Sequence, residues 1–149
     1  MKRILFLSLS FLLFSINLCM AGNSSTSMTP IIDKADNLVS YIEQDLDMEI
    51  VRMEFDILRS TKTTIRTLSA GWNYAIIAFG DFRFSDIDVK VYRKVGGNWQ
   101  IVEKDADTSA VAVVSINPPS DGEYLIEIKA YSFESGYDVG HYGLIIAHE

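Results

Sequence analysis

The sequence has few of the residues that carry covalent and acid–base chemistry. It contains one cysteine, Cys19, and two histidines, His141 and His148. A lone cysteine cannot close an intramolecular disulfide, and Cys19 lies in a segment that we expect to be removed. The histidines are seven positions apart, so on a single strand they would point to opposite faces. Gly-x-Ser-x-Gly, His-Glu-x-x-His and phosphate-loop motifs are also missing. We therefore predict no disulfide and no catalytic residues.

Long apolar runs are missing too, apart from one near the N-terminus. Residues 4–18 are apolar with few interruptions, and they follow Lys2 and Arg3. Small residues then stand at the −3 and −1 positions of a cut before Gly22. This is the pattern of a secretory signal peptide, and the run is shorter than the roughly 20 residues of a membrane span. We predict a signal peptide over residues 1–21 and an exported protein, periplasmic or secreted, with no membrane span in its mature form.

Two alternatives to simple cleavage remain open. The apolar segment may be an uncleaved anchor, or Cys19 may be lipidated. Against lipidation, residues 16–18 lack the small residue that stands directly before a lipidated cysteine.

Basic residues are the minority among the charged ones. The chain has 13 basic and 20 acidic residues and a net charge of −7. Two basic and no acidic residues fall in the leader, so the remaining chain carries −9. Nucleic acid and anionic membranes both require a basic patch. We therefore exclude them as partners and expect a protein or carbohydrate ligand in the envelope or outside the cell.

The mature chain begins with a short linker and a helix. Residues 22–29 are rich in Ser and Thr and predict a flexible lead-in. Thr29 as N-cap and Pro30 at the first helical position predict a helix start. Apolar residues spaced by three and four predict an amphipathic, acidic helix over residues 30–48. The apolar stripe consists of Ile31, Ile32, Ala35, Leu38, Val39, Ile42 and Leu46, and the acidic face of Asp33, Asp36, Glu43, Asp45 and Asp47.

From residue 49 the apolar period changes from about 3.6 to 2, which is typical of strands. Residues 51–57 alternate apolar with charged, as in a half-buried strand. Residues 72–79 are almost wholly apolar and predict a central strand covered on both faces. We predict a mainly β fold over residues 49–149: an antiparallel, eight-stranded sandwich or jelly roll behind the N-terminal helix. The expected strands are 51–57, 61–68, 72–79, 86–94, 99–104, 110–116, 124–130 and 142–147.

Five motifs occur in a fixed order along this region. They are Leu-Ser-Ala-Gly-Trp-Asn-Tyr (68–74), Asp-Ile-Asp-Val-Lys-Val-Tyr (86–92), Gly-Gly (96–97) with Asp105, Pro-Pro-Ser-Asp-Gly-Glu-Tyr (118–124) and Gly-His-Tyr-Gly-Leu (140–144). Together they resemble the bacterial pre-peptidase C-terminal domain, a small β-sandwich attached to many secreted proteases. The resemblance covers about residues 50–147 and leaves the helix outside it. It implies a non-catalytic accessory module, and some members of the family bind Ca²⁺.

Turn residues within these motifs have expected structural roles. Gly96 and Gly97 predict the centre of a hairpin, because glycine takes positive φ at little cost. Gly71 is expected in a second turn and Gly122 in a tight corner. Tyr124, just after this corner, is expected to bury its ring and to hydrogen-bond its hydroxyl to the backbone, as in the tyrosine corner of other sandwiches.

Three aromatic residues are candidates for ligand contact. Phe82 and Phe84 fall in an expected loop, and Trp99 follows the Gly96–Gly97 turn. These rings either fold back over the ends of the sandwich or form a platform for a sugar or a protein.

The Gly96–Gly97 hairpin also sets a strand register. With these glycines at the centre, Lys90 faces Glu103, a favourable pair. A register shifted by one residue would place Lys90 opposite Lys104 instead, so we prefer the first.

This register predicts a cation site. It sets Asp88 opposite Asp105 and Asp86 opposite Asp107, and directly opposed like charges destabilise a sheet by up to about 1 kcal/mol per pair. Ca²⁺ takes about six to eight oxygen ligands, and Asp81 is near enough in sequence to add one. A calcium site at these five residues is one interpretation. The alternative is that pairing ends before residue 88 and the carboxylates extend into water.

These observations favour an exported, non-catalytic binding or accessory module. A second hypothesis is a structural or regulatory protein whose acidic helix docks on a partner. An enzyme of unknown class is the third.

Overall fold

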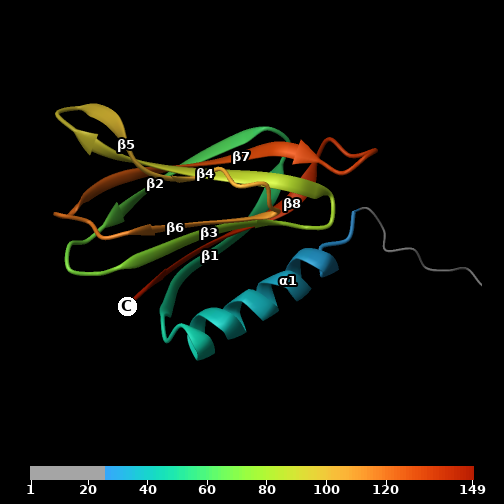
Figure 1. Cartoon of the computed structure of the whole chain (residues 1–149), viewed down its shortest axis with the longest axis horizontal. Helices are drawn as coiled ribbons and strands as arrows, with labels where there is room; N and C mark the ends of the chain where they lie inside the picture. Colours follow the sequence, from blue (N-terminus) through green and yellow to red (C-terminus); the bar gives the residue numbers. More distant parts are fainter. Residues whose placement is uncertain (1–25) are drawn as a thin grey trace, which may run out of the picture.

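The computed structural model describes residues 26–149, so the expected signal peptide lies outside the described residues. Eight antiparallel strands form two four-stranded sheets behind an N-terminal helix, which confirms the predicted sandwich (Figure 1). The helical segment comprises α1 (Thr29–Ser40) and a π-helical turn, η1 (Tyr41–Asp45). Across the first sheet the order is β1 (Glu49–Leu58), β8 (Gly140–His148), β3 (Tyr74–Gly80) and β6 (Val111–Ile116). Across the second it is β2 (Thr61–Leu68), β7 (Gly122–Phe133), β4 (Phe84–Val95) and β5 (Asn98–Asp105).

The first sheet is covered on both faces, and β3 at its centre is buried at every residue. Tyr74, Ile76 and Ala78 point into the sandwich core between the sheets. Ile77 and Phe79 point the other way, into a second core beneath the helix. The prediction of a doubly covered central strand is thus confirmed, although the strand begins at Tyr74 and leaves Trp72 outside it.

The helix packs its apolar stripe on the outer face of the first sheet (Figure 1). Ile31 and Ile42 are fully buried there, in one cluster with Ile145 of β8. The helix therefore covers a sheet face. It starts one residue earlier than predicted, with Met28 rather than Thr29 as its N-cap. None of the described helices is long and apolar enough to cross a membrane.

Between Arg52 and Asp56, strand β1 turns its charged side chains toward the opposite sheet, whereas Leu58 at its end is buried in the sandwich core. Glu54 lies opposite Leu144, a sandwich-core residue, and bonds to Arg66 of β2. Phe55 points outward and packs against the helix-side core. The alternation of apolar and charged residues could not by itself predict which of the two kinds of side chain faces the opposite sheet.

The predicted hairpin register is correct only near its turn. Val95 lies opposite Asn98 and Lys94 opposite Trp99, as expected, and both central glycines have positive φ. Beyond Tyr92 the register shifts by one residue, so Lys90 lies opposite Lys104 and Val91 opposite Glu103. The predicted pairs Lys90–Glu103, Asp88–Asp105 and Asp86–Asp107 are therefore wrong. The physical reason is a β-bulge at Val102, which adds one residue to β5. Lys90 reaches Glu127 of β7 instead, with Nζ and Oε1 3.6 Å apart.

Candidate functional site

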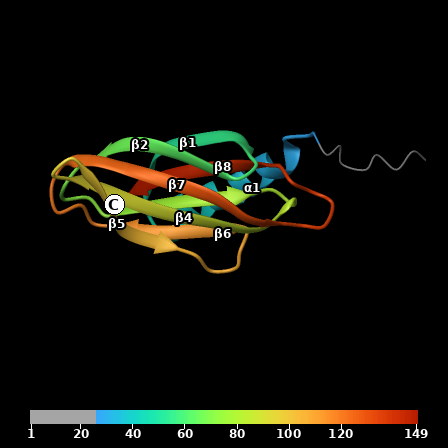
Figure 2. The same ribbon diagram turned by 90° about the horizontal axis from the view of Figure 1, so that it is seen from above.

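The sandwich has two open long sides, each formed by one edge strand from each sheet. Figure 2 shows β1 and β2 along one side and β5 and β6 along the other. On the first side, Arg66 of β2 contacts Glu54 of β1. On the second, the Val113 amide of β6 donates to Asp105 of β5 over 2.7 Å. Each side holds a small cavity.

The cavity on the first side is rich in nitrogen donors. We call it the basic pocket, and its volume is about 250 Å³. The hydrophobic members of its lining belong to the sandwich core or its rim, and Arg52, Arg66 and His148 supply the positive and polar groups. Its full lining is Val51, Arg52, Arg66, Thr67, Leu68, Tyr74, Ile146 and His148.

A three-residue ion network forms one wall of the basic pocket. Glu54 Oε1 accepts hydrogen bonds from Arg52 Nε and from Arg66 Nη2. Burial raises the pKa of Glu54, but the two arginines outweigh it and leave the pKa below its usual value. This network of two guanidinium groups and one carboxylate is net positive, although the chain as a whole is acidic and Glu49 lies opposite His148.

Two nitrogen atoms in the basic pocket are buried without a partner. They are Arg66 Nε and His148 Nδ1. An unsatisfied buried donor typically costs about 1–3 kcal/mol. Across residues 26–149 only four buried side-chain polar atoms are in this state, and the other two, Arg93 Nε and Tyr124 Oη, line the cavity on the second side. Each of these four atoms therefore belongs to a residue that lines one of the two cavities.

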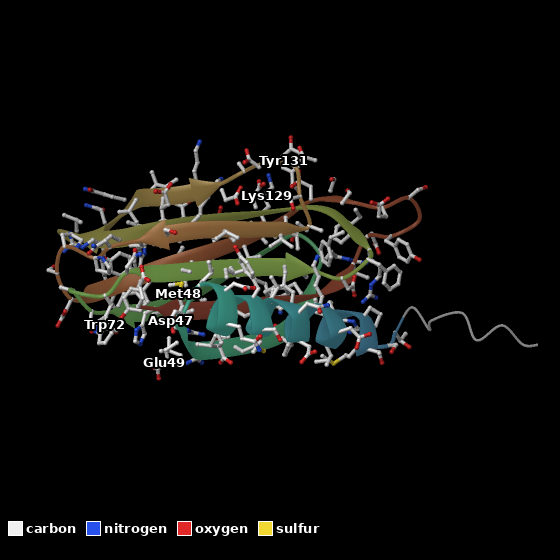
Figure 3. The ribbon with its side chains drawn as sticks, turned by 60° about the horizontal axis from the view of Figure 1, so that its bottom comes forward. Asp47, Met48, Glu49, Trp72, Lys129 and Tyr131 are labelled. Carbon is white, nitrogen blue, oxygen red and sulfur yellow. The ribbon has the colours of Figure 1, made fainter. Side chains whose placement is uncertain are left out.

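An exposed aromatic ring stands beside the basic pocket. Trp72 is 45% exposed, and its ring centroid lies 4.2 Å from that of His148. Tyr74 contacts the same imidazole edge-on, at 5.8 Å. Figure 3 shows Trp72 at the end of the molecule where the helical segment ends and β1 begins. This site was not predictable from the sequence, because His148 lies far along the chain from Arg66 and Trp72 and the three residues match no motif.

The predicted aromatic platform is not assembled. Phe84 belongs to β4 and is buried in the sandwich core against Phe133. Phe82 is 44% exposed and meets Tyr137 edge-on, just before β4 begins. Trp99 is half-buried beneath Lys94, at the opposite end of β4. The three rings therefore cannot contact one ligand.

Asp81 is held in a buried polar cluster rather than left available as a ligand. Arg83 donates to both of its carboxylate oxygens, and the His141 amide donates to Oδ2 over 3.1 Å. The Arg83 guanidinium also donates to His141 Nδ1 over 2.6 Å. Burial raises the pKa of Asp81, but the Arg83 and backbone hydrogen bonds outweigh it and lower the pKa.

Two of the other four predicted calcium ligands are also engaged, while Asp88 is buried and Asp107 is exposed. Asp105 accepts from the amides of Asp107 and Val113, and Asp86 accepts from the Ser109 amide. Within residues 26–149, no group of three or more His, Cys, Asp or Glu residues could hold a metal ion. Calcium binding stays a prediction without an assembled site in this part of the chain. A rise in melting temperature in millimolar Ca²⁺ would be the evidence for it.

The expected corner around Gly122 differs from the prediction. Gly122 begins β7 without positive φ, and a Cβ there would meet nothing within 4 Å. Tyr124 buries its ring completely, as predicted. Its hydroxyl has no partner, so the predicted tyrosine-corner hydrogen bond is wrong. Gly71 does adopt the expected positive φ, at 87°.

The chain has no match among protein-family models or among curated proteins. Its structure is similar to the pre-peptidase C-terminal domain of a Bacillus anthracis collagenase, with a TM-score of 0.48 and 13% identity over 64% of this chain and 87% of that one. It is also similar to the Yersinia pseudotuberculosis-derived mitogen, with a TM-score of 0.44 and 17% identity over 66% and 85%. A third similar structure is PliG of Aeromonas hydrophila, a periplasmic inhibitor of g-type lysozyme, with a TM-score of 0.44 and 16% identity over 66% and 85%.

Proposed function

We propose that this chain is an exported, non-catalytic binding module whose ligand site is the basic pocket. The observation that carries the proposal is the pair of unpartnered buried nitrogens, Arg66 Nε and His148 Nδ1, in two residues that line the same cavity. A protein that keeps two such atoms beside an open cavity gains stability when an acceptor occupies it.

The chemistry of the basic pocket favours a carboxylate-bearing ligand. A carboxylate accepts hydrogen bonds from Arg66 Nε and from a protonated His148 Nδ1, and charge-assisted bonds of this kind are strong. Trp72 offers an exposed aromatic face beside it, on which a sugar ring can stack. The volume of about 250 Å³ is below the roughly 300–1,000 Å³ of sites for drug-sized ligands. A single acidic sugar unit fits these conditions.

The histidines support a non-catalytic role. His148 is on the sandwich-facing side of β8, together with Ile146, while His141 is on the opposite side and is held by Arg83 and Asp81. The alternative, docking of the helix on a partner, would have to use its acidic face, because Ile31, Ala35 and Ile42 are buried on the sheet.

Calorimetric titration of the purified protein with glucuronate and with glucose tests the proposal. We expect glucuronate to bind and glucose to bind at least about tenfold more weakly, since glucose lacks the carboxylate. Arg66→Gln should weaken glucuronate binding about tenfold or more, and added salt should weaken it further. Arg59→Gln is the matched control, because Arg59 lies outside the pocket in an exposed ion pair with Asp138.

Trp72→Ala separates stacking from charge. We expect it to weaken glucuronate binding and to leave the binding of acetate, which has no ring, unchanged. Equal affinity for glucuronate and glucose, or no binding of glucuronate and acetate at low salt, would refute the proposal.

A further inference from the structure

The cavity on the second long side has a different chemistry. It lies between β5 and β6, and we call it the tyrosine cavity; its volume is about 210 Å³. Ile116, Pro119 and Val102 provide apolar surface, and a cation, an anion and a phenol provide the polar groups. The full lining is Arg93, Val102, Glu103, Ser115, Ile116, Asn117, Pro119 and Tyr124.

Two residues that line the tyrosine cavity each bury a hydrogen-bonding atom without a partner. Tyr124 is fully buried, and its hydroxyl and Arg93 Nε both lack a hydrogen bond. The two residues lie directly opposite each other in the β4–β7 ladder, so their side chains share a face. Burial raises the pKa of Tyr124 and the Arg93 charge opposes this, which agrees with a guanidinium close to the hydroxyl. The remaining contact of Arg93 is a donation from Nη2 to Ser120 Oγ.

The bulge in β5 brings a carboxylate to the same cavity. With Val102 as the extra residue, Glu103 lies opposite Val91, whose side chain is in the sandwich core. Without the bulge, Glu103 would face Lys90 on the outer surface. Bulges are common beside functional sites because they redirect side chains in this way.

Opposite charges thus share the tyrosine cavity without being joined. Among the ion pairs of residues 26–149, none links Arg93 to Glu103. The Glu103 carboxylate accepts only a local bond, from the Lys104 amide over 2.9 Å. Water could fill the space, but water alone gives no reason for a bulge that adds an anion to a cavity already holding a cation.

We infer that the tyrosine cavity binds a small zwitterion, a free α-amino acid with a short apolar side chain. Its carboxylate accepts hydrogen bonds from Arg93 Nε and Tyr124 Oη, and its ammonium group donates to Glu103. The side chain packs on Ile116 and Pro119. The cavity volume limits the ligand to a small one.

Alanine and its two halves test this inference directly. Propionate lacks the ammonium group of alanine and ethylamine lacks the carboxylate. Titration of the purified protein, followed by calorimetry or by NMR, should show that L- or D-alanine binds at least about tenfold more tightly than either half.

Two isosteric variants assign the contacts. Glu103→Gln should remove the preference for alanine over propionate, and Tyr124→Phe should weaken both about tenfold while leaving the fold intact. Glu123→Gln is the matched control, since Glu123 pairs with Lys94 on the exposed surface of the same sheet. Thermal melts of each variant verify that it is folded.

The outcomes separate this inference from the proposed function. Arg66→Gln should leave alanine binding unchanged, and Glu103→Gln should leave glucuronate binding unchanged. Equal binding of alanine and propionate, an unaltered preference in Glu103→Gln, or no binding of glycine, alanine or valine to the folded protein overturns the inference.

Discussion

At the scale of single residues, this sandwich contains carboxylates in opposite electrostatic situations. Asp81 is bonded to Arg83 and to backbone amides, and its pKa is lowered. Asp88 is also buried, but its pKa is raised, first by burial and then by Asp86, with Lys129 and Lys90 opposing. One carboxylate therefore stabilises the folded state when it is charged, and the other destabilises it.

The raised pKa of Asp88 predicts that neutralising it is favourable. The folded state holds this proton more tightly than the unfolded state, so stability falls as pH rises above the usual value of 3.8. Asp88→Asn should raise the melting temperature at pH 7 by about 2–5 °C, and the gain should vanish below pH 3.8. Asp138→Asn, in an exposed ion pair, is the control and should change little. A lower melting temperature for Asp88→Asn at pH 7 would mean that Lys129 dominates.

The lowered pKa of Asp81 predicts acid sensitivity. Its contribution to stability is fully present above the unfolded value of 3.8 and is lost as pH falls through the lower folded value. Asp81→Asn leaves Arg83 buried without its carboxylate, and such a change typically costs about 3–5 kcal/mol. Urea unfolding at pH 7 measures this loss. The variant should also show a shallower fall in stability between pH 4 and pH 2 than the parent, and identical slopes would disprove the assignment.

At the scale of elements, most of the fold was predictable and the exceptions have physical causes. Turn residues separated all eight strands, and several strands showed a period of two because they bury one face. Strand β3 was marked instead by an unbroken apolar run, because both of its faces are buried. The bulge at Val102 was not predictable, because no residue pattern around it marks a bulge. The strand register beyond the bulge was therefore predicted wrongly. The arrangement of the proposed calcium ligands depended on that register, so it was wrong as well. The inward turn of Glu54 depends on Arg66, which lies in the other sheet.

The helix should behave as part of the core. Ile42 is fully buried between the helical segment and the first sheet, so Ile42→Ala should lower the free energy of unfolding by about 2–5 kcal/mol. Ile32→Ala is the matched control: its side chain is 45% exposed, and a change within about 0.5 kcal/mol is expected. Equal effects of the two substitutions in urea unfolding would show that the helix is not packed as described.

At the scale of the whole molecule, the two proposed ligand sites lie on opposite long sides of one sandwich. One is beside β1 and β2 and the other beside β5 and β6, which Figure 2 shows on opposite sides. Neither site was identified from the sequence, because each collects residues from several strands: Arg52, Arg66 and His148 in one, Arg93, Glu103 and Tyr124 in the other. Charge composition predicted an acidic protein correctly. It could not reveal a local positive excess, which arises only when two edge strands meet.

The helix-side core joins the first and last elements of the described chain. Ile31, near the start of α1, is buried in the same cluster as Ile145 and Ala147 of β8. During synthesis the helix is made first, and it has no complete surface to cover until the final strand has emerged. Closure of this core is therefore a late, long-range event, and such contacts form slowly. The helix-side core therefore stays incomplete until β8 has been made.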